Sequence, residues 1–402
     1  MRFGVFMAPF HTRQGLNPSA VLRRDLREIQ LLDELGYDEA WVGEHHSAGA
    51  EIIASPEMFC AWAAGQTERI RLGTGVISLP YHNPLWVADR AVLLDNITRG
   101  RFMLGVGPGL LAFDAAMVGL DPGAVRDYLQ EDFPVLMHLL RSEESLTVET
   151  SRYRLVDARV QLAPYSDFDV AVTSVLTPSG PLLAGRHGVG LLQLSGLTPE
   201  GMAVLPEHWK VMQSQAATYG TTVSRDQWRV VGIIHIAETR DQAIEEVRYG
   251  LDDYFDYAQY VAGGAVHLLA AGSTFDDRLA WATSTGFALV GTPDDAIAKL
   301  GELIDASQGG IGAFLFWAQE WTTSEARRRN YELFAERVMP VFQGSLRRPA
   351  AARQHAVDHL GELASQRDAG TRRFLQDHVD SVSSVGRRRL AASNTNGEVK
   401  AT

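Results

Sequence analysis

The chain has 402 residues, 46% of them hydrophobic and 21% charged, so it can bury a large core and is neither disordered nor fibrous. Its formal charge of −12 at pH 7 argues against binding to nucleic acid or to an anionic membrane, because most of the surface would repel phosphate groups. The single cysteine, Cys60, can form neither an internal disulfide bond nor a zinc cluster. These properties are typical of an enzyme of the reducing cytoplasm.

Segments for secretion or membrane insertion are not expected. The N-terminus begins with a strand pattern and lacks a charged segment followed by an apolar signal core. No apolar run approaches the ~20 residues that cross a bilayer. We therefore expect a cytoplasmic location.

Short apolar runs, typical of buried strands, alternate along the chain with longer amphipathic stretches, typical of helices. Strands are predicted at residues 2–8, 39–44, 70–78, 101–106, 170–174, 189–194, 228–237 and 311–317. Helices are predicted at residues 18–35, 55–67, 84–97, within 122–140, and at 179–187, 199–219, 240–255, 293–306 and 324–342. Parallel strands joined by helices, eight times over, close into a (β/α)8 TIM barrel, an α/β fold of ~250 residues plus insertions. The near-equal size of the eight units favours this closed barrel over an open doubly wound sheet.

Three segments depart from the alternation. Residues 145–162 alternate polar and apolar side chains and predict a small hairpin outside the repeat. Residues 258–286 predict an insertion before the last strand, which is either a lid over the site or a long surface loop. From residue 346 the chain carries ten Lys or Arg against six Asp or Glu. We expect a barrel domain at 1–345 and a C-terminal extension at 346–402, partly helical and then disordered, which is either an arm for a partner or a solvated extension.

Ionisable side chains gather where the first three strands end. His11 follows the first strand, Glu44, His45 and His46 end the second, and His82 follows the third. Active sites of such barrels lie at the carboxyl ends of the strands, so we expect the four imidazoles to line one cavity. Successive residues of a strand point to opposite faces, so Glu44 and His46 share a face that His45 does not, which counts against a metal site.

Two turns could hold a flat, phosphorylated ligand. Residues 105–109 have the spacing G-x-G-x-G, which is not a dinucleotide fingerprint, because no helix opens at once and Pro108 removes an amide. Glycine does let a flat ligand approach the backbone there. Residues 174–180 follow the fifth strand and open a helix, where hydroxyl groups and free amides favour a phosphate, although the same residues are ordinary helix caps.

Several motifs, in order and at matching spacings, resemble the bacterial luciferase-like flavin monooxygenases. They are Glu44-His45-His46, Gly73-Thr74-Gly75-Val76-Ile77-Ser78-Leu79-Pro80, Leu94-Asp95, Thr98-Arg99-Gly100-Arg101-Phe102 and Gly291-Thr292-Pro293. The resemblance runs from residue 1 to about 343. Residues 43–49 and 236–240 bring it closest to the limonene monooxygenase-like branch.

The resemblance implies a two-component enzyme. Reduced FMN, supplied by a separate flavin reductase, would react with oxygen to give a flavin 4a-hydroperoxide that oxygenates a hydrophobic organic substrate such as a terpenoid or a polyketide. His45 falls on the family's catalytic histidine. We expect its charge to change near neutral pH, with Glu44 orienting either His45 or the adjacent His46.

The resemblance also implies where cofactor and substrate lie. A cis peptide bond under the flavin ring is expected at Gly75–Val76. Cofactor contacts are expected from Met7, Gly75, Val76, Gly107, Leu110, Ser174, Val175, Thr177, Ser179 and Gly180, and substrate contacts from His11, His82 and Trp317. Trp41, Trp86 and Trp321 are either further apolar walls or plain core. No metal is expected.

The chain departs from luciferase itself at two places. Gly107 and Pro108 stand where luciferase has a reactive cysteine and an arginine, so light emission is not expected, and Leu176 stands where luciferase has an acidic residue. Two other functions stay open. A deazaflavin-dependent oxidoreductase on the same barrel usually needs further basic residues near the cavity, and Arg186 is the only one beside the phosphate loop. The other is a noncatalytic flavin-binding barrel.

The resemblance further implies a homodimer that uses the helices after the second and third strands. The expected substrate is hydrophobic, and the sequence does not choose among hydroxylation, epoxidation and ester insertion.

Overall fold

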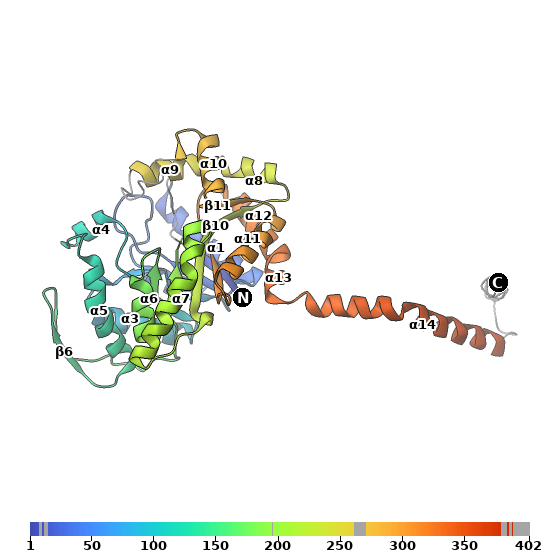
Figure 1. Cartoon of the computed structure of the whole chain (residues 1–402), viewed down its shortest axis with the longest axis horizontal. Helices are drawn as coiled ribbons and strands as arrows, with labels where there is room; N and C mark the ends of the chain where they lie inside the picture. The colour runs from blue at the N-terminus through green and yellow to red at the C-terminus, as the bar shows by residue number, and fades with distance from the viewer. Residues whose placement is uncertain are drawn as a thin grey trace. The chain divides into compact units, whose positions relative to one another are not determined.

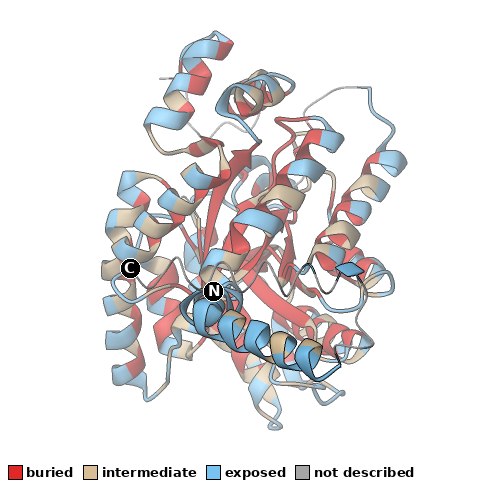
Figure 2. Cartoon of the chain, turned by 90° about the vertical axis from the view of Figure 1, so that its right-hand side faces the viewer, coloured by how far each residue is buried: buried red, intermediate tan, exposed pale blue. Residues whose placement is uncertain are grey.

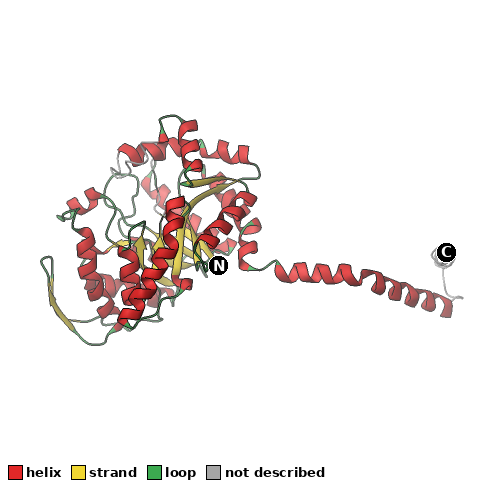
Figure 3. Cartoon of the chain, viewed as in Figure 1, coloured by secondary structure: helices red, strands yellow, loops and turns green. Residues whose placement is uncertain are grey.

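The computed structural model describes residues 1–7, 10–11, 15–194, 196–260, 271–378, 384–385 and 388. The chain divides into two compact units, residues 1–343 and 344–402. The first unit contains strands enclosed by helices (Figures 1 and 3). Each unit is described below by itself.

Eight parallel strands form a closed ring in the first unit. They are β1 (Arg2–Met7), β2 (Glu39–Val42), β3 (Arg71–Thr74), β5 (Phe102–Gly107), β8 (Val170–Ser174), β9 (Gly190–Gln193), β10 (Trp228–Ile236) and β12 (Ala313–Trp317). The ring closes because β10 pairs with both β9 and β12, and β12 pairs with β1. The predicted (β/α)8 barrel is therefore confirmed.

Helices connect the strands and cover the outside of the ring. They are α1 (Pro18–Leu35), α2 (Pro56–Ala64), α3 (Pro84–Thr98), α4 (Ala112–Met117), α5 (Val125–Arg141), α6 (Ser179–His187), α7 (Pro199–Tyr219), α8 (Arg240–Val247), α9 (Leu251–Tyr260), α10 (Phe275–Ser284), α11 (Pro293–Ala306), α12 (Ser324–Arg337) and α13 (Met339–Gln343). α1 shows how the sequence sets the ends: Asn17 caps it, Pro18 opens it, and Gly36 ends it at a φ of 83°. Among the described helices, none combines the length and the apolar composition that a membrane crossing requires.

Two predicted helices are each broken into a pair. The predicted helix at 240–255 is α8 and α9, because Gly250 lies against the chain after β12, where an added Cβ would be 2.1 Å from the carbonyl oxygen of Glu320. The predicted helix at 324–342 breaks at Val338 into α12 and α13, because Pro340 has no amide hydrogen for the helical ladder.

Other elements add to the predicted barrel. The hairpin is confirmed as β6 (Leu146–Glu149) and β7 (Arg154–Ala158), which pair antiparallel. β4 (Ile77–Ser78) pairs with β5. Neither α4 nor β11 (Ala288–Gly291) was predicted. β11 pairs outside the ring with the last four residues of β10. The insertion predicted at 258–286 contains α10, and its residues 261–270 lie outside the described residues.

The strands of the ring are coloured as buried in Figure 2. Their inward side chains form a buried cluster inside the ring. Trp41 is the largest of them and lies flat against strands that carry glycine. A Cβ on Gly73 would be 2.5 Å from Cε3 of Trp41, and one on Gly75 would be 2.8 Å from its Cβ. Trp41 is therefore part of the core.

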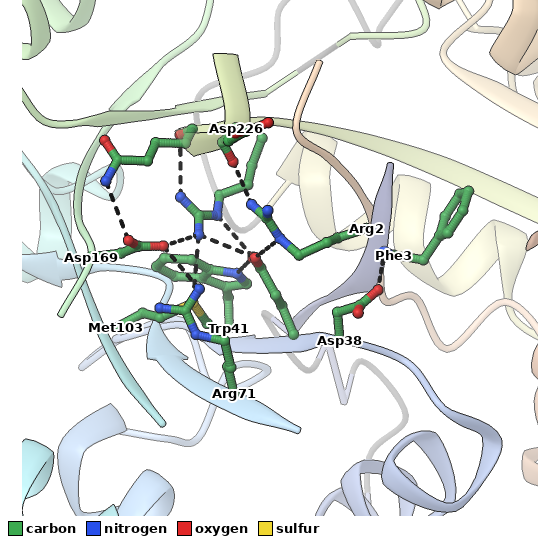
Figure 4. Close-up of polar contacts among 11 residues, drawn as sticks. Arg2, Phe3, Asp38, Trp41, Arg71, Met103, Asp169 and Asp226 are labelled. Atoms are coloured by element: carbon green, nitrogen blue, oxygen red, sulfur yellow. Dashed lines mark hydrogen bonds and ion pairs between the residues drawn. The ribbon is translucent and has the colours of Figure 1, made fainter. Parts of the chain in front are cut away.

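The amino-terminal end of the ring is closed by a buried network of ion pairs (Figure 4). Nε of Arg229 lies 2.8 Å from Oε2 of Glu39, and Nη2 of Arg229 pairs with Asp169. Arg2 and Arg71 complete the network at 2.8 Å from Glu39 and 3.0 Å from Asp169. Burial opposes the charge of both carboxylates, but Arg229 and its neighbours outweigh burial and lower the pKa of each to about 2.

The second unit contains α14 (Arg347–Asp377), a helix with no buried residue. The disorder predicted at the end of the chain concerns residues that lie, for the most part, outside the described ones.

Candidate active site

His45 lies just after β2, between two carboxylates. Its Nδ1 is 3.1 Å from Oδ2 of Asp114, and its Nε2 is 2.9 Å from Oε2 of Glu51. Asp114 comes from α4, and its Oδ1 also accepts the hydroxyl of Ser47 at 2.5 Å and the amide of His46 at 3.2 Å. These bonds tie the turn after β2 to the helix after β5.

The charge of His45 follows from these neighbours. Burial opposes the charged form, but Glu51 and Asp114 outweigh burial and raise the pKa of His45 to about 10. The same hydrogen bonds act on Asp114, whose pKa is lowered although burial opposes this. The expectation that His45 changes its charge near neutral pH is therefore wrong: the pair of carboxylates holds it as an imidazolium.

Glu44 organises the other two imidazoles of this rim. Its Oε1 lies 2.8 Å from Nε2 of His46 and 2.6 Å from Nε2 of His82, and its Oε2 accepts the amide of Ser78 at 2.7 Å. Burial opposes the charge of Glu44, but these hydrogen bonds outweigh it and lower its pKa. Glu44 therefore orients the adjacent imidazoles and not His45. Glu44 and His46 do contact each other, but the strand predicted to Glu44 ends at Val42, so both lie in the turn after β2 and strand alternation does not explain the contact.

His11 is not brought together with the other three imidazoles. Its Nε2 lies 2.9 Å from Asp25 of α1, and its Nδ1 lies 3.2 Å from Glu320. Burial opposes its charge, but these carboxylates raise its pKa to about 9. Both ring nitrogens are in use, which corrects the expectation that His11 contacts substrate.

The side chains expected to form the apolar walls of the site differ in their exposure to solvent. Trp317 ends β12 beside Phe6 and Phe10, with ring centroids 6.2 and 6.3 Å away. Trp86 is 63% exposed on α3, so it is not a wall of a buried site. Leu110 is 74% exposed on the turn between β5 and α4.

Two more residues that were expected near the cofactor or as apolar walls are packed inside the protein. Met7 is buried in the main core. Trp321 is buried against Tyr254, and the ring centroids are 5.6 Å apart. Neither side chain is exposed at the rim.

Glycines shape the turns expected beside a flavin. The peptide bond between Gly75 and Val76 is cis, as the resemblance predicts. A Cβ on Gly107 would lie 2.7 Å from Oγ1 of Thr173 and 2.8 Å from Cγ2 of Val76. Gly107 also pairs in register with Ser78, whose amide binds Glu44. The glycine turn after β5 and the Glu44 group therefore lie next to each other.

The expected phosphate loop joins β8 to α6. The hydroxyl of Ser174 is buried and donates to the carbonyl of Thr177 at 3.1 Å, so Ser174 shapes the loop from inside. The hydroxyls of Thr177 and Ser179 lie 3.1 Å apart, and no side chain caps α6. Gly180 lets α6 start close to the sheet, since a Cβ there would lie 2.4 Å from the carbonyl oxygen of Thr173. Val175 is exposed on this loop.

The sequence analysis missed the two partners of His45. Glu51 and Asp114 lie in segments without regular periodicity, and Asp114 is 69 residues from His45 in the chain. The one available signal was that Asp114 follows the fourth strand of the ring, at the end where barrel active sites form. No three of the described His, Cys, Asp and Glu side chains converge as a metal site would require.

Comparisons with known proteins show the family of the chain. The profile of the family described as luciferase-like monooxygenase matches residues 1–308. The chain is 44% identical over 344 residues to the limonene 1,2-monooxygenase of Rhodococcus erythropolis, which covers 86% of this chain and 87% of that protein. It is 41% identical over 349 residues to the 4-hydroxyprotoasukamycin monooxygenase of Streptomyces nodosus subsp. asukaensis, covering 86% of this chain and 93% of that one.

A solved structure has the same fold. It is the oxygenating constituent of the 3,6-diketocamphane monooxygenase of Pseudomonas putida, a type II Baeyer-Villiger monooxygenase in complex with FMN. The TM-score is 0.70 at 24% identity, and the match covers 85% of this chain and 98% of that one. At this identity the likeness establishes the fold and not the cofactor.

Proposed function

Because the chain belongs to the luciferase-like monooxygenase family, we propose that it uses reduced FMN and molecular oxygen to oxygenate a hydrophobic organic substrate. The observation that carries the proposal is the pairing of His45 with Glu51 and Asp114 at the carboxyl ends of the strands. A buried imidazolium there can stabilise the negative charge that develops when oxygen is reduced.

The flat ring of the flavin is assigned to the turn beside Gly107 by the family resemblance. A Cβ at this position would collide with Thr173 and Val76, so glycine lets the turn pack closely against the Gly75–Val76 peptide. The ring would be held by Met7, Gly75, Val76, Gly107 and Leu110, and the phosphate by Ser174, Val175, Thr177, Ser179 and Gly180. When bound, reduced flavin supplies the electrons that activate oxygen.

The three imidazoles near the strand ends have different roles in the proposed reaction. Both nitrogens of His45 lie within ion-pair distance of a carboxylate, and Nδ1 is also hydrogen-bonded to Asp114, so His45 contributes a positive charge at neutral pH. His46 and His82 bind Glu44 through Nε2 and are partly exposed, so each can exchange a proton through Nδ1. In this scheme His45 stabilises charge, His46 moves a proton, and Glu44 orients His46 and His82.

The proposal is tested by adding reduced FMN to the protein and tracing labelled oxygen into the product. Anaerobic protein with reduced FMN is mixed with ¹⁸O₂ and a panel of terpenoids, polyketides and long-chain ketones, and products are analysed by mass. One ¹⁸O atom in the product is expected, and its position separates hydroxylation, epoxidation and ester insertion. Turnover with a reduced deazaflavin in the absence of oxygen would instead establish the oxidoreductase alternative. Tight flavin binding with no turnover of any kind would establish a noncatalytic barrel.

The proposal includes a flavin reductase as partner, in a cytoplasmic setting. The expected result is that the chain does not oxidise NADH by itself and makes product only when an NADH-dependent FMN reductase is added. Product formation from NADH and FMN without a reductase would remove this partner from the proposal.

The proposal also includes a homodimer through α2 and α3. These helices expose large apolar side chains, which isolated surfaces seldom carry together. They are Met58, Trp62, Trp86, Leu93 and Ile97, of which Met58 is 75% exposed. Sedimentation of the wild type and of Trp86→Glu tests the interface: we expect a dimer that the charged variant weakens, and a wild-type monomer at micromolar concentration would exclude it.

A further inference from the structure

The carbonyl groups of the loop after β8 are bonded within the protein. The carbonyl of Val175 accepts Nε2 of Gln193, and that of Thr177 accepts the hydroxyl of Ser174 at 3.1 Å. The carbonyl of Pro178 accepts the amide of Leu182 at 2.9 Å. The loop thus directs these acceptors into the protein, although an extended loop would expose them to solvent.

Gln193 and His208 hold this arrangement from beneath. Gln193, at the end of β9, is 0% exposed, and His208, on α7, is 3% exposed. Oε1 of Gln193 lies 2.8 Å from Nδ1 of His208. Because the carbonyl of Val175 can only accept, the amide of Gln193 must present its nitrogen to the loop and its oxygen to the ring. Nδ1 of His208 therefore carries the proton.

The imidazole of His208 is neutral at neutral pH. Burial lowers its pKa and outweighs a hydrogen bond to the carbonyl of Leu176 and the charge of Glu207. Gln193 thus binds the carbonyl of Val175 and is itself oriented by the N–H of a neutral, buried imidazole. This places no fixed negative charge beneath the loop.

With the carbonyls bonded inward, the loop offers donors to an anion. Within the described part of the chain, the amides of Leu176, Thr177 and Gly180 have no hydrogen-bond acceptor. Free amides at the start of a helix attract phosphate, but only while neighbouring carbonyl oxygens point elsewhere. The orientation of the carbonyls is therefore part of the recognition of phosphate.

We propose that Gln193 and His208 are positioning residues that hold the loop of residues 175–178 in its phosphate-binding conformation. The inference rests on the proposed function, in which this loop binds the phosphate of the flavin. It predicts that the pair affects the phosphate group of the ligand and leaves the ring system alone.

The test compares FMN with riboflavin, which lacks only the phosphate. Dissociation constants of both are measured by quenching of flavin fluorescence for the full-length wild type and for Gln193→Met, which keeps the volume and removes the amide. We expect the variant to bind FMN about tenfold more weakly, the effect of one lost hydrogen bond, and to bind riboflavin within about twofold of the wild type.

Asn330→Leu is the matched control. Asn330 is also a buried carboxamide that holds the backbone after a strand, since its Oδ1 accepts the amide of Ile236 at 2.8 Å, but it lies on α12. The control is expected to lower stability without changing the ratio of FMN to riboflavin affinity. Should Gln193→Met fail to fold, His208→Phe keeps a ring of similar size and is expected to shift the ratio in the same direction, by less.

The outcomes separate the two proposals. If the wild type does not prefer FMN to riboflavin, the phosphate site of the proposed function is wrong and this inference falls with it. If the wild type prefers FMN and the variants at Gln193 and His208 keep that preference, only this inference is overturned. If the variants bind FMN and riboflavin more weakly by the same factor, Gln193 and His208 have only a structural role, and this inference is likewise overturned.

Discussion

The two ends of the barrel both bury charge, but they do so with different partners. At the amino-terminal end, Glu39 and Asp169 pair with arginines, among them the fully buried Arg229. At the carboxyl end, Glu44, Glu51 and Asp114 pair with imidazoles. The two networks differ in what the cation can do.

A guanidinium keeps its proton at every pH that a protein survives, whereas an imidazole can release one. The amino-terminal network is therefore a fixed part of the fold, and the carboxyl-terminal groups are the part that can take part in proton chemistry. Charge alone does not mark an active site in this barrel. The nature of the cation does.

The largest effect is expected from breaking the fixed network. Arg229→Met leaves Glu39 and Asp169 without their shared partner, and breaking a buried pair in this way costs about 3–5 kcal/mol of unfolding free energy. Urea unfolding followed by circular dichroism measures it. Arg328→Met, which removes an exposed pair with Glu332, is the control and should leave the midpoint unchanged. Equal midpoints for the two variants would show that the network does not stabilise the fold.

The next prediction concerns catalysis and is measured under conditions in which the variant is folded. His45→Ala removes the imidazolium, so we expect oxygenation to slow by about 100-fold and hydrogen peroxide to be released in place of product, with little change in flavin affinity. Product mass, a peroxide assay and flavin titration measure the three quantities. His138→Ala, on α5, is the control. Unchanged coupling of oxygen consumption to product would remove His45 from the mechanism.

These two ends also differ in how far the sequence predicts them. The barrel and its strand positions follow from local periodicity, because a strand sets the direction of each side chain. The contact between Glu44 and His46 does not, since both residues lie after the end of β2. The cis peptide at Gly75–Val76 came from the family resemblance and not from periodicity.

Long-range pairing was not predictable. Arg229 is 190 residues from Glu39, and Asp114 is 69 residues from His45, so no local pattern joins them. The separation in sequence also explains why His45 was expected to change its charge near neutral pH. The ordinary pKa of an imidazole suggests this, and the two carboxylates that raise the pKa are brought to His45 only by the fold. The prediction that His11 contacts substrate was wrong for a related reason. The partners of His11 come from α1 and from the segment after β12, which are distant in the chain.

A third prediction uses alkaline pH. The pKa of His45 in the folded protein, about 10, is above its ordinary value of 6.5, so its pairing stabilises the fold fully below pH 6.5 and less as the pH rises through 10. Wild type should therefore lose more unfolding free energy between pH 7 and pH 10.5 than His45→Gln, by up to about 4 kcal/mol, since each pH unit between the two pKa values is worth ~1.4 kcal/mol. Urea titrations at the two pH values give the difference.

Asp114→Asn sharpens this prediction. It removes one of the two carboxylates, so the pKa of His45 should fall and the alkaline loss of stability should begin at a lower pH than in the wild type. The alkaline limb of the oxygenation rate should move in the same direction. Identical alkaline profiles for wild type, His45→Gln and Asp114→Asn would mean that these carboxylates do not hold the charge of His45.

The smallest effect on stability is expected when a carboxylate loses a neutral hydrogen-bond donor and keeps its charged partner. Ser47→Ala removes the hydroxyl that Oδ1 of Asp114 accepts, while the contact of Asp114 with His45 remains. Tyr153→Phe is matched to it, because it removes a hydroxyl from the buried Asp132, which stays paired with Arg152. Each should cost about 1 kcal/mol of unfolding free energy. Only Ser47→Ala should also move the alkaline limb of the oxygenation rate, because at alkaline pH Arg152 keeps its proton whereas His45 releases its own. A shift of this limb in both variants, or in neither, would contradict the division between cations that keep their proton and cations that release it.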